Sequence, residues 1–289
     1  MHIITSIFDK ELVTRLAKLK EKGIFDFYVR KFENNSILFL YPNENEFFTY
    51  ASILTLSNNI VLSTRNIDQI FGEVLIGSIL LNKKIIFTDD NDISNLLGDF
   101  KNYSIVKESD LLNEIIKVEN KKESEKRIDI DRSFIVKGVG TVSIGIVTKG
   151  SIALHDKLYL EDKEIEIKSI QIEDVNENIA ETNSWVGLAL KGIEADFLER
   201  GSILKDSAYK KRKEAKIKIK KLDFLKEKIE VNKTYTLVSN FIKTDCSIKE
   251  IDNDIITLNI KREIPIEKGD KILLLRNTIP RIFASGEVL

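Results

Sequence analysis

The sequence contains few of the residues that build disulfides, zinc sites or membrane spans. Cys246 is the only cysteine among 289 residues, so no internal disulfide can form. His2 and His155 are the only histidines, which nearly excludes a zinc site. No apolar run approaches the roughly 20 residues that span a bilayer, and MHIITSIFDKEL has neither a basic start nor a cleavage site typical of a signal peptide. We therefore expect a cytoplasmic protein with no membrane partner and no metal.

The charge of the chain is unevenly distributed. The formal net charge is −1, but residues 1–119 and 120–206 each carry −4, whereas residues 207–289 carry +7. A basic final third on a nearly neutral chain indicates a surface that faces a polyanion. The alternative is a lysine-rich solvated face without a ligand.

Residues 1–119 have the pattern of a small α/β domain. ILFL and KKIIFT are short apolar runs typical of strands, and KELVTRLAKLKEKG has helical spacing and ends at Gly23. SDLLNEIIKV predicts a second helix with Ser109 or Asp110 as its N-cap. Alternating strands and helices predict a largely parallel sheet.

The pattern changes after a polar segment, 120–127, which we interpret as a linker. From Ile128 to the end, alternating segments such as KLYL, IEIKSIQI, AKIKIKKL and KILLL predict antiparallel strands. A second polar stretch, 206–214, divides this part in two. We therefore predict a multidomain protein with an α/β domain at 1–119 and two β-barrels at 128–206 and 207–289, since barrel closure removes exposed edges.

The glycine-rich segment 134–152, FIVKGVGTVSIGIVTKGSI, raises the question of a phosphate loop. The residue three positions after Gly140 is Ser143, and alternating β-branched residues follow where a helix should begin. No Walker sequence occurs in the chain. We therefore predict a strand, a turn at Lys149–Gly150 and a returning strand, with Gly138 and Gly140 allowing a bulge or a close backbone crossing.

This segment also carries a family resemblance. DRSFIVKGVGTVSIGIVTKGSIALHDKLYL and IKSIQIEDVNENIAETNSWVGLALKGIEADFLERGSIL resemble the second domain of EF-Tu-type translational GTPases, and most closely that of the archaeal SelB type. The segment from AKIKIKKL to IPRIFASGEVL is similar to the third domain of the family. The resemblance implies an EF-Tu architecture over 128–289. Because the chain ends at Leu289, we expect no further C-terminal domain of the SelB type.

The resemblance also implies that residues 1–119 correspond to the GTP-binding domain, but the nucleotide motifs of the family are missing. SIFDKEL stands at the phosphate loop and has no glycine, and Phe25 stands where the family has its Mg²⁺-binding threonine. The metal-side aspartate is replaced by Tyr41, the γ-phosphate glycine by Glu44 and the water-orienting histidine by Asn45. The guanine-reading motif is degenerate, and its positions are Asp89, Asp90 and Asp92. We expect Glu44, Asp89 and Asp90 to repel a triphosphate. The hypothesis is a degenerate GTPase-like domain that neither binds nor hydrolyses GTP, with no cofactor.

In this family the second domain holds the aminoacyl end of tRNA against the first domain. The matching positions here are Asp131, Phe134, Gln171 and Trp185. Phe134 is also compatible with simple barrel core. Trp185 replaces an arginine that SelB-type sequences have, so selenocysteine selection is in doubt. It either stacks on the terminal adenine, caps the barrel or packs against the first domain.

A basic run at the start of the third domain provides candidate RNA phosphate contacts. The lysines at alternating positions share one strand face, opposite Ala215, Ile217 and Ile219. The alternative is an edge strand that lysines protect from aggregation. The candidate contacts are Lys210, Lys211, Arg212, Lys213, Lys216, Lys218 and Lys220.

Two functions follow. The first is a translation-factor paralogue that works without a GTP switch and contacts tRNA, the ribosome or another translation component. The second is a protein-interaction scaffold or regulator with no nucleic-acid contact. Another enzymatic activity is disfavoured because Cys246 lacks an evident base and no histidine–carboxylate set is present. The sequence specifies neither the oligomeric state nor the partner.

Overall fold

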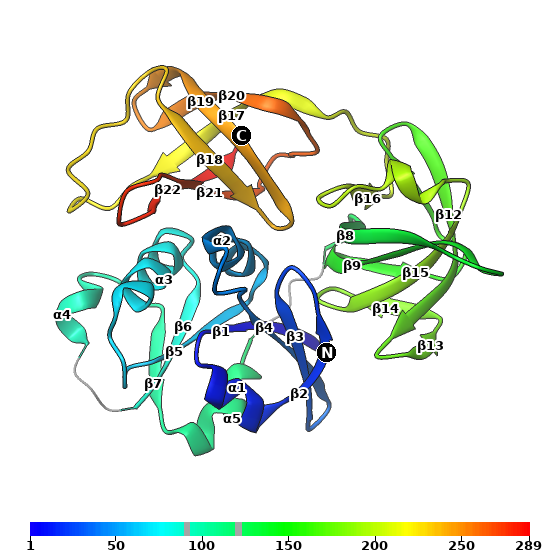
Figure 1. The fold of residues 1–289 in the computed structure, drawn as a ribbon, viewed down its shortest axis with the longest axis horizontal. Coiled ribbons are helices and arrows are strands. Elements are labelled where there is room, and N and C mark those ends of the chain that lie inside the picture. The colour runs from blue at the N-terminus through cyan, green and yellow to red at the C-terminus, as the bar shows by residue number, and fades with distance from the viewer. Residues whose placement is uncertain (90–92, 119–122) are drawn as a thin grey trace.

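A computed structural model gives the structure of residues 1–89, 93–118 and 123–289. The described chain forms an α/β domain and two β-barrels that meet around a common junction (Figure 1). Of the predicted linker, residues 120–122 lie outside the described residues, and the first barrel strand already begins at Arg127.

The α/β domain is a seven-stranded sheet between two layers of helices. Its strands are β1 (His2–Ile7), β2 (Lys18–Lys22), β3 (Asp26–Phe32), β4 (Asn35–Tyr41), β5 (Asn59–Ser63), β6 (Lys84–Thr88) and β7 (Tyr103–Val106). Its helices are α1 (Lys10–Leu16), α2 (Phe47–Leu56), α3 (Gln69–Leu80), α4 (Ser94–Leu97) and α5 (Leu111–Ile115). The strand order is β2-β3-β4-β1-β5-β6-β7, and the five strands from β4 to β7 run parallel, as predicted.

The first predicted helix is shorter than expected. It ends at Leu16, and residues 18–22 form β2 instead of continuing to Gly23. Ala17 already has extended backbone, and β2 pairs antiparallel with β3, so tertiary pairing overrides the helical pattern. The later helix is confirmed as α5, with Asp110 at the N-cap position but without a side-chain capping hydrogen bond.

The second domain, called barrel 1 here, is built from short antiparallel strands. They are β8 (Arg127–Val136), β9 (Gly140–Lys149), β10 (Ser151–Ala153), β11 (Lys157–Leu160), β12 (Lys163–Ile172), β13 (Val175–Glu177), β14 (Ile179–Glu181), β15 (Trp185–Lys191) and β16 (Ile203–Lys205). The order β11-β16-β8-β9-β15-β12 closes into a ring because β11 also pairs with β12.

The third domain, barrel 2, is a closed ring with the order β17-β20-β19-β18-β21-β22. Its strands are β17 (Arg212–Lys220), β18 (Thr234–Ser239), β19 (Ile242–Asp252), β20 (Ile255–Ile264), β21 (Lys271–Leu275) and β22 (Ile282–Val288). The prediction of an α/β domain followed by two barrels is therefore confirmed.

The glycines of the 134–152 segment have different roles from those predicted. Gly138 and Gly140 have φ of +83° and +101° and lie at the β8–β9 turn, where no backbone crosses closely. The close crossing occurs at Gly145, where a Cβ would lie 2.4 Å from the Asp129 carbonyl oxygen. Gly150 does turn the chain, but the strand that follows it, β10, pairs with β14 and does not return along β9.

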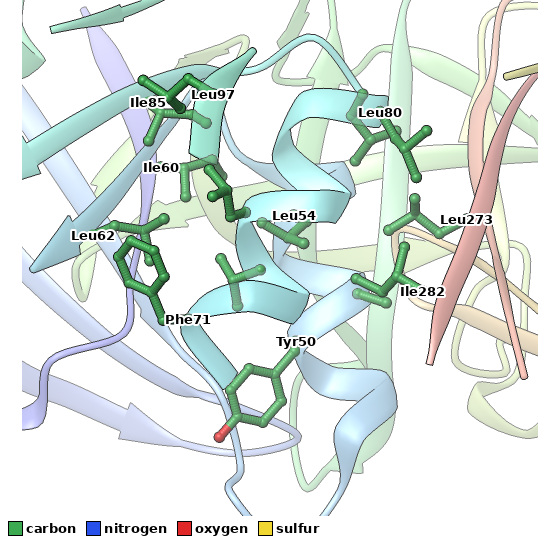
Figure 2. Packing of buried hydrophobic residues seen from close by; sticks show 14 of the residues in the cluster. Tyr50, Leu54, Ile60, Leu62, Phe71, Leu80, Ile85, Leu97, Leu273 and Ile282 are labelled. Carbon is green, nitrogen blue, oxygen red and sulfur yellow. The ribbon is translucent and has the colours of Figure 1, made fainter. Parts of the chain in front are cut away.

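Helices α2 and α3 are buried on two sides, against the sheet and against barrel 2. Figure 2 shows Leu54, Phe71 and Leu80 in one apolar cluster with Leu273 and Ile282 of barrel 2. This double burial explains why both helices carry apolar residues on more than one face. The opposite face of the sheet packs against α1 and α5.

Two structural features are absent from the part of the chain that the structure describes, a membrane-spanning helix and a metal-binding cluster. No helix there is long and apolar enough to cross a membrane. Nor do the same residues bring together three histidine, cysteine or acidic side chains in an arrangement suited to a metal ion.

Candidate functional site

The position that matches the phosphate loop is a very short connection. Only Phe8 and Asp9 separate β1 from α1, and the Asp9 carboxylate accepts a hydrogen bond from the Leu12 N–H at 2.8 Å. The Phe8 ring stacks on Tyr50 at 5.9 Å between centroids. A helix N-terminus attracts anions, and here a side chain of the same helix occupies it. The cleft beside these residues holds about 200 Å³, below the ~300–1,000 Å³ typical of small-molecule sites.

The matching end of β4 carries an internal hydrogen bond. The buried Tyr41 hydroxyl donates to Glu44 Oε1, and burial together with this bond raises the pKa of Tyr41. Lys10 Nζ lies 4.2 Å from the centre of the Tyr41 ring. The Asn45 N–H donates to Asn43 Oδ1 at 3.2 Å and thereby belongs to the local turn.

The acidic residues near the guanine-reading position are only partly described. The Asp89 carboxylate accepts hydrogen bonds from Arg65 Nε at 3.0 Å and from Ser63 Oγ at 3.1 Å. Asp89 is therefore paired within the protein. Asp90 and Asp92 lie outside the described residues.

A cavity of about 530 Å³ lies between the α/β domain and barrel 1. Its floor is the outer face of β8, β9, β15 and β12, and its cover is formed by β2, β3 and β4. Its wall combines polar and apolar residues, and the apolar ones include Phe27, Val29 and Leu38 on the cover and Val142 and Ile144 on the floor. Its volume lies within the ~300–1,000 Å³ range typical of small-molecule sites.

Three of the four residues predicted for the aminoacyl end line this cavity: Phe134, Gln171 and Trp185. Phe134 is 40% exposed, so it is not barrel core. Gln171 Nε2 donates to Asn176 Oδ1 at 3.0 Å. Asp131 does not reach the cavity: it is fully buried, and its carboxylate pairs with Arg132 at 2.7 Å and Arg200 at 3.0 Å.

Trp185 packs against the α/β domain, one of the predicted alternatives. Its ring stacks on Phe27 of β3, with 3.9 Å between centroids, and lies 6.4 Å from Phe241 of barrel 2. Phe241 in turn stacks on Phe25 at 5.7 Å. These four rings, the aromatic junction, connect all three domains at one edge of the cavity.

Charged residues surround the mouth of the cavity. Lys20 of β2 pairs with Asp174, and the Ser36 hydroxyl of β4 donates to Glu173 Oε1 at 2.7 Å. Glu21 of β2 also lines the cavity and pairs with Arg132 of β8. Burial lowers the pKa of His2, so its imidazole is neutral near pH 7.

Sequence reasoning missed the part of this site that the α/β domain contributes. The cover residues belong to β2, which the helical pattern had hidden, and to the neighbouring strands β3 and β4. The one available signal was the exposed, charged sequence KLKEK after Ala17, which has no apolar helical face.

A buried charge network connects the two barrels. The Arg127 side chain, 2% exposed, donates to Asp129 at 3.0 and 3.1 Å and to Asp270 of barrel 2 at 2.7 Å. Asn240 of barrel 2 adds a hydrogen bond from Nδ2 to Asp129 at 3.0 Å, and its N–H donates to the Thr55 hydroxyl of α2 at 2.8 Å. Asn240 therefore contacts both other domains.

The predicted basic face lies on β17. Lys216, Lys218 and Lys220 point outward, and the three apolar residues between or beside them are buried, as predicted. β17 pairs with β20 on one side and β22 on the other, so the alternative of an edge strand is wrong. The reason is that the barrel closes and leaves no edge at this strand.

Some of the basic candidates are engaged within the protein. Lys211 pairs with Glu161 at 2.8 Å, Lys218 with Asp254 at 3.4 Å, and Lys220 Nζ lies 3.5 Å from the Ile79 carbonyl oxygen of α3. The other four have no ion-pair partner among the described residues: Lys210, Arg212, Lys213 and Lys216.

No family model matches the chain. In sequence, it is 35% identical over 165 residues to an uncharacterised protein of Methanocaldococcus jannaschii, a match that covers 56% of this chain and 54% of that protein. It is 30% identical over 191 residues to the selenocysteine-specific elongation factor of the same organism, covering 56% of this chain and 41% of the factor. The matched segment thus spans about half of the length of the first relative and less than half of the length of the second.

The structural similarity covers nearly the whole chain. SelB of Methanococcus maripaludis, solved in complex with the GTP analogue GppNHp, superposes with a TM-score of 0.79 at 20% identity, over 99% of this chain and 78% of SelB. A bacterial selenocysteine-specific elongation factor superposes with a TM-score of 0.80 at 19% identity, over 99% of this chain and 58% of that factor. The chain therefore has the three-domain fold of these translation factors.

Proposed function

We propose that the protein is a SelB-like translation-factor paralogue that works in the cytoplasm without a GTP switch. The observation that carries this proposal is the connection at Phe8 and Asp9, where a carboxylate caps the helix that would otherwise face the phosphates. A triphosphate would have to displace this carboxylate and would gain no glycine N–H groups or loop lysine in return. The proposal includes neither GTP hydrolysis nor any other enzymatic activity.

Contact with a translation component is the second part of the proposal. The outward lysines of β17, together with Lys210, Arg212 and Lys213, form a basic surface suited to phosphate groups of tRNA or ribosomal RNA. Phe134, Gln171 and Trp185 lie in the cavity between the domains and are the candidates for holding the aminoacyl end. Asp131 would act only indirectly, by holding Arg132 and Arg200.

A titration with fluorescent GTP in the presence of Mg²⁺ tests the first part. We expect no saturation at micromolar protein concentration, whereas micromolar Mg²⁺-dependent binding would contradict the proposal.

A gel shift with tRNA tests the second part. We expect a shift at low salt that weakens steeply as the salt concentration rises, because phosphate contacts release counterions. Replacing Lys213 and Lys216 by glutamine should weaken the shift. Lys261, which pairs with Asp245, provides a matched control position on the same barrel.

A scaffold function is the second candidate, and the tip of the β8–β9 hairpin favours it. Ile135 is 73% exposed, and Phe134 and Val139 beside it are also exposed. Isolation of the protein from its native cell separates the two functions. A stable protein partner without nucleic-acid absorbance supports the scaffold, and copurifying tRNA or ribosomes support the translation factor.

A further inference from the structure

We propose that a second cavity, at the junction of the three domains, binds a small phosphorylated polyol, a molecule that combines an oxyanion with hydroxyl groups. This junction cavity holds about 660 Å³, within the ~300–1,000 Å³ range of small-molecule sites. The α/β domain lines it with residues 55–59 and 82–84, barrel 1 with 148–149 and barrel 2 with 269–271. The inference goes beyond the proposed function and does not depend on it.

The junction cavity lies away from the sites described above. It is at the edge of the sheet where β5 and β6 begin, whereas the Phe8–Asp9 connection follows the end of β1. Because β1, β5 and β6 run parallel, these are opposite edges of the sheet. Among the described residues, only Asn183 lines both this cavity and the one between β2–β4 and barrel 1. A ligand here would therefore occupy neither the phosphate-loop position nor the candidate aminoacyl site.

The wall of the junction cavity is almost entirely polar. Among the described residues, Leu56 and Val118 are the only apolar side chains that line it. Serine and threonine hydroxyls and asparagine amides make up much of the remainder. Because side-chain amides both donate and accept hydrogen bonds, such a wall suits a ligand with several hydroxyl groups. The asparagines are Asn58, Asn59, Asn82, Asn102, Asn183 and Asn240.

One of these amides has an unused acceptor. Asn59 is fully buried, and its Nδ2 donates to the Ile115 carbonyl oxygen at 3.0 Å. Its Oδ1 is buried without a hydrogen-bond partner among the described residues. A buried acceptor without a donor is costly, so this position favours a ligand that supplies a hydroxyl donor.

Two lysines of the α/β domain share one carboxylate at this cavity. Lys84 and Lys117 lie 2.6 and 2.8 Å from Glu114. Both lysines line the cavity, whereas Glu114 is not part of the lining. One carboxylate does not neutralise two ammonium groups, so this part of the wall carries a net positive charge.

The charges that the two barrels contribute are largely balanced. Lys149 pairs with a carboxylate at 2.9 Å, and Lys271 is also paired. The acids of the lining are Asp270, which binds Arg127 at 2.7 Å, and the exposed Glu123. The positive charge that no carboxylate balances therefore lies on the α/β side of the cavity.

Lys83, on the same α/β side, has no carboxylate partner among the described residues. Its Nζ donates to the carbonyl oxygens of Thr55 and Ser57, at 3.0 and 2.6 Å, where α2 ends. An ammonium group has three N–H donors, so one remains for a ligand. Loss of hydration and the nearby charge of Lys271 lower the pKa of Lys83 to about 8. A bound oxyanion would counteract both effects, and the geometry therefore places it beside Lys83.

Calorimetric titration of the full chain with glucose 6-phosphate tests the proposal. We expect saturable binding at pH 7 and constant ionic strength. Glucose lacks the oxyanion and inorganic sulfate lacks the hydroxyl groups, so both should bind at least about tenfold more weakly. The absence of saturable binding of glucose 6-phosphate, or equal binding of all three probes, would overturn the proposal.

Two variants place the probe in the junction cavity. Lys83→Gln removes the charge but keeps an N–H donor for the carbonyl oxygens, and it should weaken binding at least about tenfold. Lys117→Gln changes a side chain that is 65% exposed, so it should leave the fold intact and weaken binding severalfold. Lys107→Gln is the control, because Lys107 is an exposed lysine that follows β7 at the opposite edge of the sheet. Full affinity in both cavity variants, or an equal loss in the control, would contradict the proposal.

The pH dependence of binding separates a direct role of Lys83 from a structural one. With a pKa of about 8, its charged form falls to about one tenth of the protein at pH 9. The phosphate group has its second pKa near ~6 and keeps its charge from pH 7 to pH 9. The affinity should therefore fall about tenfold over this range in the parent and stay constant in Lys83→Gln. A parent without this dependence, or a variant that retains it, would overturn the role of Lys83 in binding the oxyanion.

Phosphate groups beside hydroxyl groups also occur in RNA, and competition with tRNA distinguishes the two sources. We expect the affinity for glucose 6-phosphate to be unchanged by an excess of tRNA, because the junction cavity and the basic face of β17 are formed by different residues. Displacement of the sugar phosphate by tRNA would overturn the assignment to a small molecule. Binding of glucose 6-phosphate without any gel shift of tRNA would support the junction site and contradict only the RNA part of the proposed function.

Discussion

The α/β domain contacts the two barrels in opposite ways. Against barrel 2 it presents α2 and α3, and a cluster of buried apolar side chains spans the contact. There is so little space that a Cβ on Gly77 of α3 would lie 2.8 Å from the Ile282 side chain. Against barrel 1 it presents the strands β2–β4, and a cavity of about 530 Å³ remains between them. One domain thus has one closely packed contact and one hollow contact.

This difference separates a contact that is filled by side chains from one that leaves space for a ligand. The packed contact contains the Glu73 carboxylate, 1% exposed, which accepts hydrogen bonds from the N–H groups of Arg281 and Ile282 at 2.9 and 3.1 Å. The hollow contact is bridged at its mouth by exposed ion pairs such as that between Lys20 and Asp174. Buried hydrogen-bonded charges tolerate little change, whereas exposed pairs contribute little stability.

Replacement of Glu73 by alanine should have the largest effect. The change removes the buried carboxylate and leaves the Ile282 N–H without a partner, so we expect a loss of about 3–5 kcal/mol in the free energy of unfolding. Urea denaturation measures it. Glu108→Ala, which removes exposed ion pairs with Arg15 and Arg65, is the control and should cost far less. Equal effects would show that the packed contact does not depend on Glu73.

A matched pair of isoleucines provides the second test. Ile282→Ala, at a fully buried position in the packed contact, should cost about 2–5 kcal/mol. Ile144→Ala, on the wall of the cavity, should cost about 1 kcal/mol, because that side chain already borders empty space. The two midpoints of urea unfolding measure the difference. A larger loss at Ile144 would mean that the hollow contact is as tightly packed as the other.

The smallest effect is expected at the mouth of the cavity. Asp174→Ala removes the ion pair between Asp174 and Lys20. Because the Asp174 side chain is 83% exposed, we expect the free energy of unfolding to change by about 0.5 kcal/mol or less. Thermal unfolding at low and high salt measures this change. A loss above 2 kcal/mol would show that these pairs hold the domains together.

Much of the architecture was predictable because the pattern of residues changes along the chain. Alternation in IEIKSIQI and AKIKIKKL correctly predicted strands β12 and β17, since one face of each is buried in a barrel. The helix predicted to reach Gly23 was wrong at its end, because residues 18–22 satisfy their backbone by pairing with β3, which no local pattern reveals.

The candidate site was predictable only on its barrel side. Phe134, Gln171 and Trp185 were found from their positions in the family pattern, and all three line the cavity. Phe27 and Glu21 were missed because they belong to the α/β domain, and only the three-dimensional fold brings them to the cavity. Asp131 lies on the same strand as Phe134 but is turned inward, and register along a strand decides this orientation.

The turn between β18 and β19 determines the order in which the aromatic junction is completed during synthesis. Phe25, Phe27 and Trp185 are all made before Phe241, which packs beside them. At about 5–20 residues per second, the ribosome needs several seconds to pass from residue 185 to residue 241. Throughout that interval the nascent chain lacks the final neighbour of these rings, so the junction is completed only after translation has reached barrel 2.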